Sequence, residues 1–126
     1  MNTNVEVLVV DDLTHMRRLV KTMLKNLGFR SIHEAGDGKE ALEVLESKNI
    51  GLIVSDWNMP NMTGIEFLRQ VRSMEKYRDT PFLMVTAEAT KENIIEAIGA
   101  GVSNYVVKPV QADIFESKLR LILKKN

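Results

Sequence analysis

Two short apolar segments that each lead into acidic side chains limit the folds that this chain can adopt. The segment 5–10 (VEVLVV) is followed by Asp11 and Asp12, and the segment 52–54 (LIV) leads to Asp56. Short apolar runs of this kind are typical of strands that are buried on both faces of a parallel sheet. If the two strands are neighbours, three carboxylates meet at one edge of the sheet, where their repulsion requires a cation or a proton.

Segments with helical spacing of apolar residues alternate with strand-like segments along the chain. We expect strands at 5–10, 31–35, 52–54, 82–86 and 104–107, and helices at 16–27, 41–48, 64–74, 94–98 and 114–122. This alternation with short loops predicts an α/β domain, in which helices cover both faces of a doubly wound, five-stranded parallel sheet. Open parallel sheets of this type bind ligands at the carboxyl ends of their strands.

Threonine side chains are suited to cap two of the expected helices. Thr14 precedes the first apolar stripe and Thr63 precedes Gly64, so we expect both to act as N-caps. The polar segment 75–80 shows no apolar pattern, and we expect it to be a loop.

The composition argues against several classes of function. The chain has 126 residues with 17 basic and 17 acidic side chains, so no overall field draws it to nucleic acid or to an anionic membrane. The absence of cysteine excludes disulfides, thiolate zinc sites and a cysteine nucleophile. The first residues do not resemble a signal peptide, and no apolar run is long enough to span a membrane. We therefore expect a cytoplasmic monomer with a single domain, residues 1–126.

Four strand ends carry polar side chains that suit phosphoryl chemistry: Asp11 with Asp12, Asp56, Thr86 and Lys108. Three carboxylates without a nearby histidine or cysteine favour Mg²⁺, which prefers oxygen ligands and keeps several waters. A cation among carboxylates, with an ammonium and a hydroxyl opposite, can receive a phosphoryl group. Asp56, a lone Asp at the tip of its strand, is then the expected nucleophile.

Four short motifs at these strand ends resemble those of the response-regulator receiver domain. They are VVDD at 9–12, SDWNMPNM at 55–62, VTAEA at 85–89 and YVVKP at 105–109, in order along nearly the whole chain. The similarity is greatest to the single-domain chemotaxis regulators of this family, which lack an output domain. It implies a flavodoxin-like fold with the strand order 2-1-3-4-5 for which those regulators are known, an order that the apolar pattern alone does not give.

The resemblance implies a role for each residue of the acid site. Asp56 would accept a phosphoryl group from a phosphohistidine on a chemotaxis-type histidine kinase. Asp12 and Asp56 would bind Mg²⁺ directly, and so would the backbone carbonyl of Asn58. Asp11 would act mainly through a bound water.

The resemblance also implies a switch and a limited lifetime for the phosphoryl group. Thr86 and Lys108 would contact the phosphoryl oxygens, and the ring of Tyr105 would move with Thr86. Water would later hydrolyse the acyl phosphate, with Asn58 and Glu88 flanking its path and tuning the rate. The alternatives are a static, half-buried ring for Tyr105 and a helix-capping hydroxyl for Thr86.

Partner-binding positions can be carried over in the same way. Four of them match the face on which chemotaxis members of the family bind the flagellar switch: Ala89, Ile94, Tyr105 and Lys118. A phosphatase is a further implied partner. The family often has Phe where this chain has Val110, which leaves the target open. A receiver with a non-motor target, or one that acts as a phosphate sink, is the alternative.

Two other classes of function fit part of the pattern. A Mg²⁺-dependent phosphohydrolase with an aspartyl nucleophile would turn over small phosphomonoesters, but haloacid-dehalogenase-like enzymes have a second Asp where this chain has Asn58. A flavin-binding protein of similar fold would need a hydroxyl-rich first loop, whereas this loop is acidic at Asp11 and Asp12. A phosphoacceptor signalling protein, rather than an enzyme, is therefore the leading hypothesis.

Overall fold

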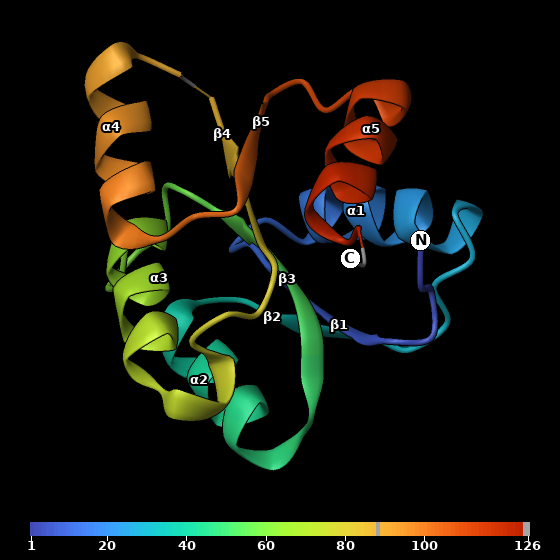
Figure 1. Ribbon diagram of the computed structural model, residues 1–126, viewed down its shortest axis with the longest axis horizontal. Helices are drawn as coiled ribbons and strands as arrows, with labels where there is room; N and C mark the ends of the chain where they lie inside the picture. Colours follow the sequence, from blue (N-terminus) through green and yellow to red (C-terminus); the bar gives the residue numbers. More distant parts are fainter. Residues whose placement is uncertain (88, 125–126) are drawn as a thin grey trace.

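Five parallel strands form one sheet in the computed structural model, which describes residues 1–87 and 89–124 (Figure 1). The strands are β1 (Glu6–Val10), β2 (Ile32–Ala35), β3 (Ile50–Asp56), β4 (Phe82–Thr86) and β5 (Asn104–Val107). Their order across the sheet is β2-β1-β3-β4-β5, and every neighbouring pair is parallel. The predicted doubly wound α/β fold and its strand order are thus confirmed.

Helices cover both faces of this sheet. They are α1 (Thr14–Asn26), α2 (Gly38–Ser47), α3 (Gly64–Ser73), α4 (Lys91–Ala100) and α5 (Ala112–Ile122), with a short 3₁₀ helix η1 (Glu75–Tyr77) after α3. Helices α1 and α5 lie on one face, and α2, α3 and α4 lie on the other (Figure 1). Within the described part of the chain, no helix combines the length and the apolar character that a membrane span requires.

The core has two parts because side chains alternate between the faces of a strand. In β1, Val7 and Val9 pack with α1 and α5, whereas Leu8 and Val10 pack with α2, α3 and α4. All four side chains are buried. Burial on both faces explains why β1 has no polar residue after Glu6. Because β1 and β3 are both packed in the core, they hold the backbone of the acidic residues at their ends in place.

One of the two predicted helix caps is correct. The Thr63 hydroxyl accepts a hydrogen bond from the Glu66 N–H at 3.2 Å, and the Glu66 carboxylate accepts one from the Thr63 N–H at 2.9 Å. The prediction for Thr14 is wrong, because Leu13 occupies the N-cap position of α1 and Thr14 is already helical. The carboxylate of Asp11 accepts the Leu13 N–H at 2.9 Å, so an acid of the strand end supports the start of this helix.

The segment 75–80 is more ordered than a loop, which corrects the expectation for it. It begins with η1, and the side chain of Tyr77 is only 1% exposed. The Tyr77 hydroxyl lies 2.7 Å from the carbonyl oxygen of Leu45 and 2.6 Å from that of Lys48. One aromatic ring therefore ties this polar segment to the end of α2, and a search for apolar periodicity does not detect a single anchoring residue of this kind.

Candidate functional site

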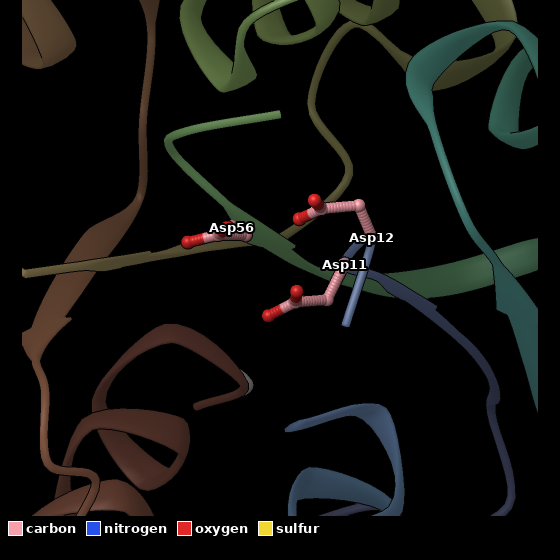
Figure 2. Close-up of side chains that lie close together, drawn as sticks. All are labelled: Asp11, Asp12 and Asp56. Carbon is pink, nitrogen blue, oxygen red and sulfur yellow. The ribbon is translucent and has the colours of Figure 1, made fainter. Parts of the chain in front are cut away.

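Neighbouring parallel strands bring the three predicted acids together. β1 and β3 pair with Val10 opposite Ser55, so Asp11 and Asp56 follow directly at the same edge of the sheet. One carboxylate oxygen from each of Asp11, Asp12 and Asp56 lies within 4.8 Å of the others. Figure 2 shows that the three side chains extend to the same side of the strand ends. The structure thus confirms the predicted convergence of these carboxylates.

Lys108 compensates part of the negative charge in this cluster. The Lys108 ammonium lies 3.0 Å from Asp56 Oδ1 and 3.9 Å from Asp11 Oδ2. Asp11 and Asp56 are each 4% exposed, whereas Asp12 is exposed to solvent. Burial raises the pKa of Asp11, the Leu13 N–H lowers it in part, and the charge of Asp56 raises it further. The site is therefore short of positive charge when all three acids are ionised.

The donor set fits a hard divalent cation. Asp11, Asp12 and Asp56 offer oxygen atoms at distances from one another that one ion can bridge, and the three carboxylates exceed the charge that Lys108 supplies. Mg²⁺ prefers such oxygen ligands and tolerates a site that is open to water on one side, as it is at Asp12. Asn58 is exposed two residues after Asp56, in the loop that leaves β3.

Thr86 and Lys108 lie beside each other across the last pair of strands. Thr86 ends β4, is buried and pairs with Val107 of β5. The N–H of Lys108 donates to the carbonyl oxygen of Thr86 at 2.7 Å, so the two residues leave the sheet together next to Asp56. The capping role considered for Thr86 belongs to Thr90, whose hydroxyl accepts the Asn93 N–H at 3.1 Å.

Two of the predicted partner-binding residues are in contact with each other. Tyr105 of β5 is half-buried, and the Lys118 ammonium lies 5.0 Å from the centre of its ring. The two side chains also line an open pocket of about 310 Å³ next to α5. Ala89, two residues before α4, and Ile94, near the start of that helix, are both half-buried. Glu88 lies outside the described residues.

The sequence analysis did not identify Arg17 as part of this site. Arg17 lies in α1, and its Nη1 donates to the backbone carbonyl oxygen of Asp11 at 2.6 Å. The sequence shows only a basic side chain in the first turns of a helix that follows an acidic strand end, which is weak evidence for a contact with that strand end. Only the fold shows that this arginine turns back toward the strand.

Replacing Asp11 with Asn is expected to stabilise the metal-free protein. Its carboxyl pKa is above the ordinary value of 3.8, so protonation favours the folded state, and this contribution is lost as the pH rises from 3.8 through the folded pKa. Asn keeps an oxygen for the Leu13 N–H and removes the buried charge. At neutral pH without Mg²⁺ we expect a thermal midpoint roughly 3–5 °C higher, which corresponds to about 1 kcal/mol.

Thermal unfolding at several pH values and with Mg²⁺ checks this expectation. The advantage of the Asp11→Asn variant should shrink below the folded pKa, where the Asp11 carboxyl is already neutral. It should also shrink with Mg²⁺, because cation binding stabilises the unaltered protein. A variant that unfolds at a lower temperature than the unaltered protein in metal-free buffer at neutral pH would contradict the expectation.

Comparisons with known proteins agree with this site and fold. Residues 7–120 match the response regulator receiver domain family. The chain is 49% identical over 120 residues to the chemotaxis protein CheY of Pseudomonas aeruginosa, covering 95% of this chain and 97% of that protein. It is 46% identical over 125 residues to CheY-3 of Vibrio cholerae, covering 99% and 96%.

A solved structure shows the same arrangement of strands and helices. The chemotaxis protein CheY4 of Vibrio cholerae superposes with a TM-score of 0.90 at 36% sequence identity, over 95% of this chain and 99% of that one. The family match begins in β1 and ends in α5, so it includes every strand end that carries the acidic cluster and Lys108. The chain belongs to the response regulator receiver domain family.

Proposed function

We propose that this chain is a phosphorylation switch in chemotaxis, in which Asp56 accepts a phosphoryl group from a histidine kinase in the cytoplasm. The contact between the Lys108 ammonium and the buried Asp56 carboxylate, at 3.0 Å within a cluster of three acids, carries this proposal. The similarity to the chemotaxis proteins named above supports a role in chemotaxis. The chain is a phosphoacceptor signalling protein rather than an enzyme with a separate substrate.

The reaction at Asp56 is a direct transfer. A carboxylate oxygen of Asp56 attacks phosphorus, a P–O bond forms, and the P–N bond to the donor imidazole breaks. The imidazole nitrogen keeps the bonding electrons and takes a proton from solvent water, so the donor leaves as neutral imidazole. Mg²⁺, when bound, would neutralise charge on the phosphoryl oxygens. The proposed direct ligands of Mg²⁺ are the carboxylates of Asp12 and Asp56 and the backbone carbonyl of Asn58. Asp11 would act through a bound water.

Lys108 and Thr86 would hold the transferred group. The ammonium that contacts Asp56 can move to a phosphoryl oxygen, and the Thr86 hydroxyl can donate to another. Hydrolysis then requires water to attack phosphorus, which restores the Asp56 carboxylate and releases inorganic phosphate. Asn58 is exposed beside the site and, with Glu88, is proposed to tune this rate.

The switch would pass from Thr86 to Tyr105. Phosphorylation adds roughly −1.5 to −2 charge units at the end of β3. Thr86 is drawn toward the new oxygens, and the Tyr105 ring moves into the space that it leaves. A change from 1:99 to 99:1 in favour of the active state requires about 5.5 kcal/mol. Charge-assisted hydrogen bonds from Lys108 and Thr86 are of the kind that can supply it.

Acetyl phosphate with Mg²⁺ tests the proposed chemistry. We expect up to one phosphoryl group per chain, and no labelling in the presence of a chelator of divalent cations. Trp57 directly follows Asp56 and is half-buried, so its fluorescence should change with Mg²⁺ and again with the phosphodonor. Flat traces in both titrations would contradict the proposal. Sustained turnover of small phosphomonoesters would instead identify a phosphohydrolase.

The proposed target is the flagellar switch, through the surface formed by Ala89, Ile94, Tyr105 and Lys118. Tighter binding of a flagellar switch peptide to the phosphorylated protein than to the unmodified protein would support a motor role. Equal binding of both forms would favour the non-motor alternative. A partner phosphatase would be detected as faster loss of the label.

A further inference from the structure

Arg17 connects three segments behind the acidic cluster. Its Nη1 donates to the backbone carbonyl oxygen of Asp11 at 2.6 Å, and its Nε donates to Glu34 Oε1 at 3.2 Å. Its Nη2 lies 3.4 Å from the hydroxyl of Thr14. The Arg17 side chain is only 18% exposed. The guanidinium thus joins α1, β2 and the end of β1 through separate nitrogen atoms, a geometry that the fixed fork of arginine allows.

The carbonyl that Arg17 contacts belongs to the peptide group between Asp11 and Asp12. A peptide group is planar, so fixing this carbonyl also fixes the direction in which the chain enters Asp12. The Asp11 N–H donates to the Ala35 carbonyl oxygen at 3.1 Å, and its carboxylate accepts the Leu13 N–H. The hydrogen bond from Arg17 to the Asp11 carbonyl oxygen adds a third contact, on the side of the peptide group that leads to the exposed Asp12.

Glu34 holds the arginine in this orientation. Glu34 lies on β2, directly opposite Val9 of β1, two residues before Asp11. Its second carboxylate oxygen accepts a hydrogen bond from Lys21 at 3.2 Å. With Glu34 fixed between two basic side chains of α1, the Nη1 of Arg17 is directed at the strand end.

We propose that Arg17 is a positioning residue for the cation site: it fixes the Asp11–Asp12 peptide so that both carboxylates face Asp56. This inference rests on the proposed function, because it assumes that the three acids bind Mg²⁺. A positioning role and a purely electrostatic role of Arg17 predict opposite changes in Mg²⁺ affinity when the side chain is removed. Removing a positive charge near a cation site strengthens cation binding by Coulomb's law, whereas removing a positioning contact weakens it.

Substitutions at Arg17 and at its neighbours separate these two effects. Arg17→Ala removes the charge and the contact, whereas Arg17→Lys keeps the charge but cannot serve Glu34 and the Asp11 carbonyl from separate nitrogens. Arg18→Ala is the matched control, since Arg18 is exposed and its side chain makes no hydrogen bond to the described residues. Lys21→Ala removes a charge that reaches Glu34 but not Asp11.

Mg²⁺ affinity is measured from Trp57 fluorescence and by calorimetry at constant ionic strength. Loss of a residue that orients metal ligands typically costs 10–100-fold in affinity, so we expect roughly tenfold weaker binding for Arg17→Ala. Arg17→Lys should bind Mg²⁺ with an intermediate affinity. Arg18→Ala should bind Mg²⁺ as tightly as the unaltered protein, or more tightly. Lys21→Ala removes one of the two basic partners that fix Glu34, so its affinity should lie between those of the unaltered protein and Arg17→Ala. In the metal-free protein, the ¹⁵N shift of the Asp12 amide should change in both Arg17 variants and stay constant in Arg18→Ala.

Several results would overturn the inference. The inference would be wrong if the Arg17→Ala protein folds and binds Mg²⁺ as tightly as the unaltered protein. If Arg17→Ala does not fold, Arg17→Lys decides, because unchanged affinity and an unchanged Asp12 amide shift would exclude a positioning role. Failure of the unaltered protein to bind Mg²⁺ would instead refute the proposed cation site, and the inference with it.

Discussion

Replacing Asp56 with Asn is expected to reduce phosphoryl transfer from acetyl phosphate to background, a loss of roughly 1000-fold or more. The neutral amide oxygen is a poor nucleophile, and no acyl phosphate can form on it. The variant should still fold, because it removes a charge from a side chain that is only 4% exposed. Phosphoryl incorporation is measured by intact-protein mass spectrometry, and folding by circular dichroism.

The buried hydroxyl of Ser55 provides the matched control for Asp56→Asn. Ser55 directly precedes Asp56, and its hydroxyl donates to the Asp56 backbone carbonyl at 3.1 Å. Ser55→Ala removes the nearest alternative acceptor in the sequence and should still be labelled. Hydroxylamine should release the label, because it cleaves an acyl phosphate and leaves a phosphoserine intact. Full labelling of Asp56→Asn, or a label that resists hydroxylamine, would refute Asp56 as the acceptor.

The convergence of the acids was predictable because it depends on local pattern and on one topological rule. Apolar runs before Asp11 and Asp56 indicate buried parallel strands, and such strands all end at the same edge of their sheet. The apolar pattern did not reveal which strands are neighbours. That order came from the family resemblance, and the structure confirms it.

Contacts that depend on a single long side chain were not predictable from the sequence. Arg17 reaches back across the start of α1, and Tyr77 reaches across to the end of α2, and neither forms part of a periodic pattern. The error at Thr14 has a similar origin. Asp11 accepts the N–H of Leu13, the N-cap residue of α1, and the helix begins without the threonine cap that local preference suggests.

Replacing Gly64 with Ala is expected to destabilise the protein by about 2–3 kcal/mol, the upper part of the range seen for overpacked cores. Gly64 begins α3, and its N–H donates to the Trp57 carbonyl oxygen at 2.7 Å. An added Cβ would contact the backbone oxygen of Asp56 and would lie 2.8 Å from the Cα of Trp57. Backbone atoms cannot rotate away as a flexible side chain can, so α3 or the end of β3 must shift.

Gly99→Ala is the control for this substitution, because it makes the same chemical change where there is space. Gly99 lies in α4, and apart from its chain neighbours and the backbone of its own helix, no heavy atom of the described residues lies within 4 Å of the position that its Cβ would take. Alanine favours a helix over glycine, so Gly99→Ala should stabilise the protein by up to about 1 kcal/mol. Urea unfolding of both variants measures the two effects, which should have opposite signs.

The Gly64 variant also tests what holds Asp56 in place. If α3 packs so closely that only glycine fits beside the Asp56 backbone, a folded Gly64→Ala protein should bind Mg²⁺ more weakly than the unaltered protein. Unchanged stability together with unchanged Mg²⁺ affinity would mean that the loop after β3 adjusts freely. In that case the pairing of β3 with β1 and β4, and not the approach of α3, would fix the position of the phosphoacceptor.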